Sequence, residues 1–151
     1  MTYLLDTNLC IELLNNRNTH VARKLASISP GEVRLCSVVK AELNHGALKS
    51  RNDENVSLVR RFSTSFESLP FDDPAAEIYG RIRAALEKQG KLIGPYDLLI
   101  ASIALANNVT LVTHNLDEFK RVPDLMLEDC KPEMKTSFWL PIPVYICKPA
   151  N

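Results

Sequence analysis

The chain of 151 residues has 18 basic and 18 acidic side chains, so net charge gives it no general attraction to nucleic acid. Hydrophobic residues make up 46% and charged residues 24%, as in ordinary globular domains, and no apolar run approaches the roughly 20 residues of a membrane span. The four cysteines are widely scattered without a C-x-x-C pair, so neither a zinc site nor a disulfide framework is indicated, and we expect a cytoplasmic protein without membrane association.

Short apolar strands alternate with amphipathic helices along most of the chain. In chain order, the apolar periodicity predicts a strand at residues 3–5, helices at 9–14 and 19–27, a strand at 32–36, helices at 38–47 and 52–67, an extended segment at 68–71, helices at 75–87 and 95–106, and strands at 110–113 and 125–127. Pro70 favours an edge position, and the last strand is also expected at an edge. Strands separated by helices imply an α/β fold with a mostly parallel sheet of about four to five strands.

The ends of several helices can be read from the residues around them. A polar turn is expected at residues 6–8, between the first strand and the first helix, and Ser37 is expected to cap the helix that carries Glu42 in its second turn. The helix at 95–106 begins with Pro95 at its first position, where a missing N–H is harmless. Because this helix is apolar on nearly all sides, we expect it in the core, with Asp97 at the edge of that core.

The amino-acid composition of the chain changes at residue 131. Residues 131–151 contain four prolines and a group of apolar side chains, which excludes a regular helix. We therefore expect one domain at residues 1–130, and an extended tail at residues 131–151 packed on that domain or on a neighbour. The alternative interpretation is a partner-binding arm.

Acidic and amide side chains follow the strands or open the helices of the predicted sheet. Because the carboxyl ends of parallel strands share one edge of a sheet, we expect these side chains to lie together. They are Asp6, Glu42, Asp97, Asn115, Asp117 and Glu118. Carboxylates held close raise one another's pKa unless a positive group lies between them. A divalent cation meets this need, and oxygen ligands without a His or Cys cluster suit Mg²⁺ or Mn²⁺.

Four segments occur in an order that is specific in combination, although each is weak alone. They are Leu-Asp-Thr-Asn at 5–8, Ser-Val-Val-Lys-Ala-Glu at 37–42, Gly-Pro-Tyr-Asp at 94–97 and Val-Thr-His-Asn at 112–115. Over roughly residues 1–129 the chain resembles a PIN-domain ribonuclease of the VapC type, the toxin of a toxin–antitoxin pair. The resemblance implies a PIN-like three-layer α/β/α fold.

The same resemblance implies an activity and its partners. It implies a type II toxin that is a Mg²⁺- or Mn²⁺-dependent endoribonuclease, in which metal-activated water hydrolyses RNA phosphodiester bonds. It also implies a homodimer, a VapB-like antitoxin as inhibitor, and transfer RNA or ribosomal RNA as substrate. An alternative hypothesis is a catalytically weak module whose acidic groove captures a basic partner tail.

The family's acidic positions fall on particular residues of this chain. Asp6, Glu42 and Asp97 match the three firmest positions and are the expected catalytic residues and metal ligands, whereas Asn115 matches a fourth position that is often Asp. An amide there leaves open whether one or two ions bind. Glu118, preferred to Asp117 because an acid followed by Phe matches Glu118-Phe119, is an additional candidate ligand.

Other polar residues have weaker claims on function. Thr7, Asn8 and Thr113 are expected to orient the carboxylates through hydrogen bonds, or else to serve as turn and cap residues. His114 lies close to the expected metal site, where contact with a phosphate is the alternative, but we interpret both His114 and His45 as solvated side chains. Scattered basic residues form either an RNA-binding rim or a solvated face: Lys40, Lys49, Arg51, Arg60, Arg61, Lys88 and Lys91.

Overall fold

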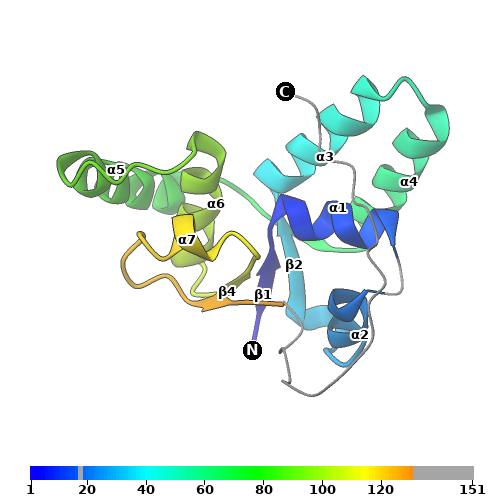
Figure 1. The fold of residues 1–151 in the computed structure, drawn as a ribbon, viewed down its shortest axis with the longest axis horizontal. Helices are drawn as coiled ribbons and strands as arrows, with labels where there is room; N and C mark the ends of the chain where they lie inside the picture. The colour runs from blue at the N-terminus through cyan, green and yellow to red at the C-terminus, as the bar shows by residue number, and fades with distance from the viewer. Residues whose placement is uncertain (17–18, 131–151) are drawn as a thin grey trace, which may run out of the picture.

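The computed structural model describes residues 1–16 and 19–130 (Figure 1). Its strands are β1 (Tyr3–Leu5), β2 (Val33–Cys36), β3 (Glu67–Leu69), β4 (Thr110–Val112) and β5 (Leu127–Glu128). Its helices are α1 (Thr7–Asn15), α2 (His20–Ala26), the short 3-10 helix η1 (Pro30–Glu32), α3 (Ser37–Lys49), α4 (Asp53–Thr64), α5 (Asp73–Lys88), α6 (Pro95–Ala106) and α7 (Leu116–Phe119). The extended tail expected at residues 131–151 lies outside the described residues.

The five strands form one sheet in the order β3-β2-β1-β4-β5, and every neighbouring pair is parallel. The predicted parallel sheet is thereby confirmed, with β3 and β5 at its two edges. Tyr3 of β1 pairs with Val33 on one side and with Thr110 on the other, so β1 is central. All five strands therefore end at the same edge, as the placement of the acidic side chains requires.

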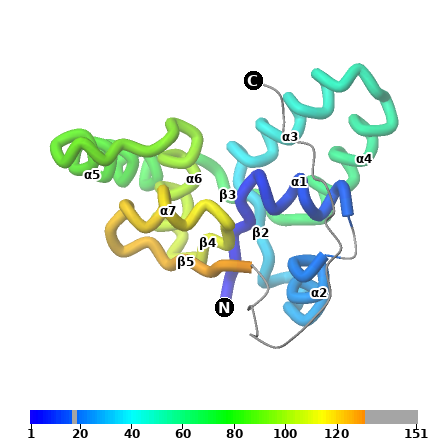
Figure 2. The backbone as a smooth tube through the Cα atoms, in the orientation of Figure 1, coloured from blue at the N-terminus to red at the C-terminus, as the bar shows by residue number. Residues whose placement is uncertain are grey.

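Helices cover both sides of this sheet, which confirms the α/β/α class. Figure 2 shows α1 to α4 on one side of the view and α5 to α7 on the other, with the strands between them. Helix α5 packs against α6, and α3 packs against α1 and α4. The central strands contribute side chains with no exposed surface, among them Leu4, Leu35 and Leu111. Burial of such side chains is the main stabilising contribution to a sheet covered on both faces.

Helix α6 has the boundaries and the burial that its sequence predicts. Gly94 precedes the helix, Pro95 occupies its first turn, and Asn108 takes a left-handed conformation (φ 51°) just beyond its end. Ser102, a polar residue in its buried body, donates a hydrogen bond from Oγ to the Leu98 carbonyl oxygen (2.6 Å). The helix is therefore a rigid, internally satisfied support for Asp97 in its first turn.

Two predicted helix starts differ from the structure. The expected turn at residues 6–8 is absent, because Asp6 itself caps α1 by accepting a hydrogen bond from the Leu9 amide (2.8 Å). Helix α1 therefore begins at Thr7. Ser37 is the first residue of α3 rather than its cap, and its Oγ accepts a hydrogen bond from the Phe71 amide (3.3 Å). Both differences arise because the strands lead directly into the helices.

Two predicted boundaries shift by a few residues. Helix α4 ends at Thr64, and β3 begins at Glu67, where the chain pairs with Arg34 of β2 and the two side chains form an ion pair (2.9 Å). The last strand lies at Leu127–Glu128 rather than at residues 125–127. Within the described part of the chain, no helix has the length and apolar character needed to cross a membrane.

Candidate functional site

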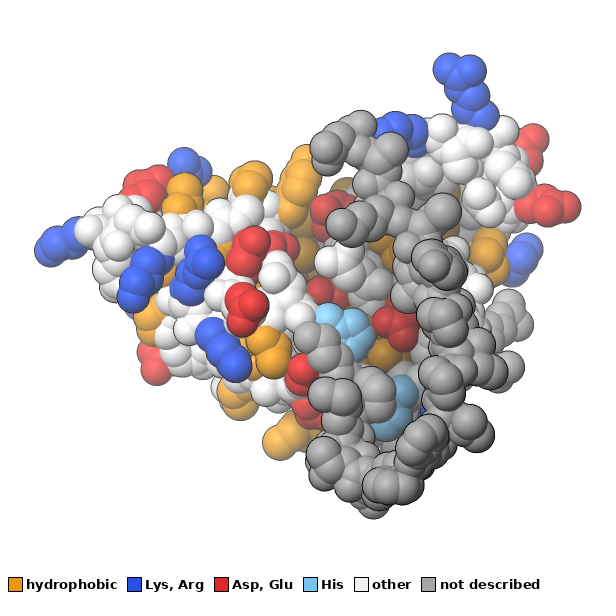
Figure 3. All heavy atoms as spheres, viewed as in Figure 1, with side chains coloured by type: hydrophobic (Ala, Val, Ile, Leu, Met, Phe, Trp, Pro, Cys, Tyr) orange, Lys and Arg blue, Asp and Glu red, His pale blue; other side chains and the backbone are white. Residues whose placement is uncertain are grey.

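Four carboxylates from separate elements meet near the carboxyl edge of the sheet. They are Asp6, Glu42, Asp97 and Glu118, which we call the acidic centre. The charges of the other three all act on the Asp97 carboxylate. Figure 3 shows Asp and Glu side chains gathered around a His side chain in the middle of the visible face. The side chains that the sequence places at strand ends and helix starts are thus brought together in space.

Asp6 is the most buried member of the acidic centre, with 3% of its surface exposed. Its Oδ1 accepts the Leu9 amide hydrogen bond that caps α1, and its Oδ2 accepts a hydrogen bond from the Thr113 hydroxyl. Burial nonetheless raises the pKa of this carboxyl, because desolvation of the charge outweighs the two hydrogen bonds. Asp6 is therefore held in place by its hydrogen bonds, and a nearby positive charge would stabilise its ionised form.

Asp97 is half-buried in the first turn of α6. Desolvation, a hydrogen bond with Glu118 and the neighbouring carboxylates raise the pKa of Asp97 to about 7. Asn115 donates a hydrogen bond from Nδ2 to Asp97 Oδ2 (3.3 Å), and Glu118 Oε2 accepts one from the Gly94 amide (3.3 Å). The residues that open α6 and α7 therefore hold two carboxyl groups against each other.

Glu42 completes the acidic centre from the second turn of α3. The Thr7 hydroxyl at the start of α1 donates a hydrogen bond to Glu42 Oε2. Thr113 has a similar role beyond β4, because its Oγ1 also accepts the Asn115 amide (2.9 Å) while it donates to Asp6. Thr7 and Thr113 therefore contact the carboxylates that they were expected to orient.

Two other predicted residues lie on the surface. Asn8 and Asp117 are both exposed, in the first turns of α1 and α7. Glu118 lies next to Asp117 in sequence, yet it is half-buried and contacts both Asp97 and Gly94. The structure thus brings Glu118, and not Asp117, into the acidic centre.

The donor set of the acidic centre fits a divalent cation. Carboxylate oxygens are the ligands that hard divalent ions prefer, and among the described residues no Lys or Arg forms an ion pair with these four acids. Within residues 1–16 and 19–130, no group of three or more His, Cys, Asp or Glu side chains is already arranged to hold a metal ion. The fit therefore lies in the chemistry of the oxygen donors and not in a preformed coordination geometry.

His114 is not the solvated side chain expected from the sequence. Its Nδ1 lies 3.0 Å from Asp129 Oδ1, and its Nε2 lies 3.3 Å from Glu12 Oε2. The pairing of Val112 with Glu128 sets the segments after β4 and β5 side by side. The contact with Asp129 thus depends on the register of the last two strands, which the sequence alone does not give.

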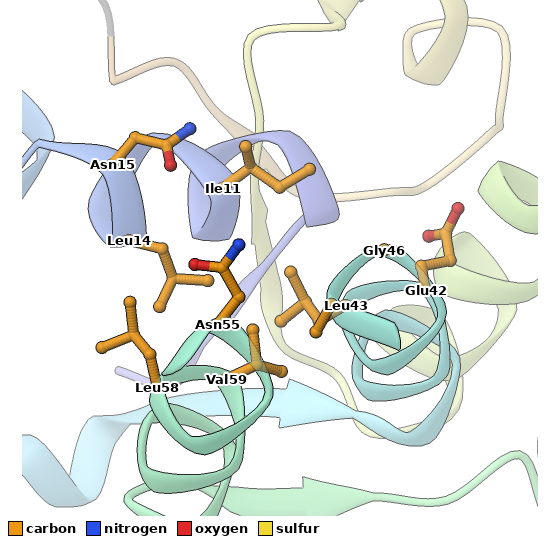
Figure 4. A pocket seen from close by; sticks show the side chains of 10 residues that line it. Ile11, Leu14, Asn15, Glu42, Leu43, Gly46, Asn55, Leu58 and Val59 are labelled. Carbon is orange, nitrogen blue, oxygen red and sulfur yellow. The ribbon is translucent and has the colours of Figure 1, made fainter. Parts of the chain in front are cut away.

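An apolar groove adjoins the acidic centre. It lies between α1, α3 and α4, has a volume of about 260 Å³, and contains Glu42 at one end (Figure 4). Its lining includes Ile11, Leu14, Leu43, Leu58 and Val59. An apolar surface that meets a carboxylate in this way suits an amphipathic segment with a basic end.

Comparison with known proteins gives consistent matches over most of the chain. Residues 3–125 match the model of the PIN domain. The chain is 40% identical to ribonuclease VapC2 of Rickettsia felis over 131 residues, which are 85% of this chain and 98% of that protein. It is 37% identical to the tRNA(fMet)-specific endonuclease VapC of Salmonella typhimurium, with the same coverage. Among solved structures, DNA-bound VapBC from Salmonella typhimurium superposes with a TM-score of 0.81 at 36% identity, covering 87% of this chain and 99% of that one.

Proposed function

Because the chain belongs to the PIN-domain family and, within it, to the VapC ribonucleases, we propose that it is an endoribonuclease that hydrolyses RNA phosphodiester bonds as the toxin of a type II toxin–antitoxin pair. The observation that carries this function is the gathering of Asp6, Glu42, Asp97 and Glu118 at one edge of the sheet. The cytoplasm, where cellular RNA is available as substrate, is the proposed place of action.

The proposed cofactor is Mg²⁺ or Mn²⁺. Asp6, Glu42 and Asp97 would hold it, with Glu118 as an additional ligand, because their oxygens form a hard anionic donor set with which no Lys or Arg of the described residues forms an ion pair. When bound, such an ion neutralises developing charge on the phosphate and makes water more acidic. The raised pKa of Asp97 supports this assignment, since a cation most strongly stabilises the ionised forms of carboxyl groups that repel one another.

The surrounding side chains hold the ligands in place. Thr113 and the Leu9 amide fix both oxygens of Asp6, and Thr7 fixes Glu42. Asn115 donates a hydrogen bond from its side-chain amide to Asp97. Its proposed role is therefore to orient that carboxylate and not to serve as a charged ligand. We therefore favour a single ion at this centre over two.

The proposed partner is a VapB-like antitoxin. Solved relatives of this chain are VapBC complexes, including VapBC2 from Rickettsia felis bound to promoter DNA. The groove between α1, α3 and α4 would receive an amphipathic segment of the antitoxin, whose basic end would lie against Glu42. A homodimer is the assembly that we propose for the toxin itself.

Asn115 also favours a second candidate function, a weak or inactive nuclease whose acidic centre mainly captures a basic partner. Isothermal titration calorimetry with Mn²⁺ separates the two functions. A ribonuclease binds the ion with an affinity that falls when Asp6 is replaced by Asn, whereas a pure capture module shows no saturable binding.

The proposed activity can be tested on defined RNA. Antitoxin-free protein with Mg²⁺ or Mn²⁺ is expected to cleave a transfer RNA, and the initiator tRNA(fMet) is the first substrate to try because a relative is specific for it. Elongator methionine tRNA and ribosomal RNA serve as comparison substrates. We expect 5′-phosphate ends on the products. Absence of cleavage of all three RNAs, with both ions, contradicts the proposed function.

Adjacent acids in α7 give a matched test of the site. Glu118→Gln is expected to lower the cleavage rate about 10- to 100-fold, because the side chain contacts Asp97 and lines the acidic centre. Asp117→Asn, one residue away and exposed, is expected to change the rate by less than about twofold. Steady-state cleavage assays on both variants measure the difference. The reverse order would assign the ligand role to Asp117.

A further inference from the structure

The acidic centre is assembled from two groups of elements. Asp6 and Glu42 come from the β1–α1 junction and α3, which the Thr7 hydroxyl joins to each other. Asp97 and Glu118 come from α6 and α7, which meet through the Gly94 amide. The relative position of the two groups sets the distances between the four carboxylates.

The segment at residues 113–115 connects these two groups. Thr113 donates to Asp6 in the first group, whereas Asn115 donates to Asp97 in the second. His114 lies between them in sequence. Any change in the path of this segment therefore alters both contacts at once.

The side chain of His114 anchors this segment at two further points. Nε2 faces Glu12 on α1 at 3.3 Å, and Nδ1 faces Asp129 just beyond β5 at 3.0 Å. The three side chains are partly buried, with 27% of the His114 side chain exposed, 35% of Glu12 and 30% of Asp129. Both partners are carboxyl groups, and each ring nitrogen lies within hydrogen-bond distance of one of them, so the nitrogen that carries the proton donates to a carboxyl oxygen.

We propose that His114 is a positioning residue for the acidic centre, a role that rests on the proposed ribonuclease function. By bridging Glu12 and Asp129, the ring fixes the path of residues 113–115, so that Thr113 meets Asp6 and Asn115 meets Asp97. His114 acts through these neighbours and does not need to contact RNA. Glu12 contributes to the same positioning, because its contact with His114 attaches residues 113–115 to α1, the helix that Asp6 caps.

Kinetics on tRNA distinguish positioning from substrate binding. His114→Ala is expected to lower kcat about tenfold with KM changed by less than about twofold, as for other residues that orient ligands. His114→Gln, which retains N–H donors, is expected to recover part of that loss. Glu12→Ala is expected to lower kcat in the same way, and the double variant to show no further loss, because both changes remove one bridge. His20→Ala on α2 is the matched histidine control, with kcat unchanged.

Hydrogen exchange tests the positioning without any activity. The Asn115 amide donates to Thr113 Oγ1 (2.9 Å), so its exchange reports the order of the segment directly. We expect exchange about tenfold faster in His114→Ala and in Glu12→Ala, and unchanged in His20→Ala. Thermal melts check that each variant is folded. If His114→Ala does not fold, the test is made with Glu12→Ala.

Several results would overturn the role of His114. Unchanged kcat, additive losses in the double variant, or a rise in KM at constant kcat would each do so, and the last would indicate direct RNA contact. If the parent protein cleaves no RNA, the ribonuclease proposal fails by itself. Unchanged exchange at Asn115 would then reject the positioning role independently.

Discussion

Replacement of Asp97 by Asn is expected to lower the rate of RNA cleavage by about a hundredfold or more. The side chain keeps its size and can still accept the Asn115 hydrogen bond, so the local structure should be retained. It loses the negative charge that holds the cation, and a cation contributes several kcal/mol to stabilising charge in phosphodiester cleavage, where each 1.4 kcal/mol is about tenfold in rate. Single-turnover cleavage of tRNA, with enzyme in excess, measures this change without interference from product release.

The matched control for this prediction is Asp73→Asn. Asp73 is also an acid in the first turn of a helix, α5, but it is exposed and lies outside the acidic centre. Its variant should cleave at the parental rate. If Asp97→Asn keeps more than about a third of the parental rate while binding Mn²⁺ normally, the acidic centre is not the catalytic site.

Most of the fold follows from local patterns in the sequence. The apolar run in α6 with Pro95 at its start, and the strands separated by helices, each have a single physical reading, and the structure agrees with both. The misplaced starts of α1 and α3 have a common cause. Asp6 and Ser37 make contacts that depend on the folded chain, with the α1 backbone and with Phe71, and such contacts decide an element's first residue.

The candidate site could also be predicted in part from local patterns. The edge of a parallel sheet collects whatever follows its strands, which is how Asp6, Asn115 and the neighbouring acids could be grouped before their contacts were known. The bridge from His114 to Glu12 and Asp129 could not, because it joins residues 102 and 15 positions apart in the chain. No helical or strand period relates such positions.

The stability of the cation-free protein is expected to depend on pH through Asp97. The pKa of this carboxyl is about 7 in the folded protein and about 4 in an unfolded chain, so the folded state holds the proton more tightly. The free energy of unfolding therefore falls as pH rises between these two values, and the loss is complete above pH 7. Because Asp97 is half-buried and partly screened by solvent, we expect about 1–2 kcal/mol rather than the full value of the shift.

Urea unfolding of Asp97→Asn beside the parent, in the presence of a chelator, isolates this contribution. The two proteins should be equally stable near pH 4, and the variant should be more stable by about 1–2 kcal/mol at pH 8. Saturating Mg²⁺ should reverse the order at pH 8, because a ligand that binds the folded parent at a hundred times its Kd adds about 2.7 kcal/mol, whereas the variant binds it weakly. Asp73→Asn should follow the parent throughout. A pH-independent difference would mean that Asp97 carries its charge in the folded protein without strain, and that its neighbours need no cation between them.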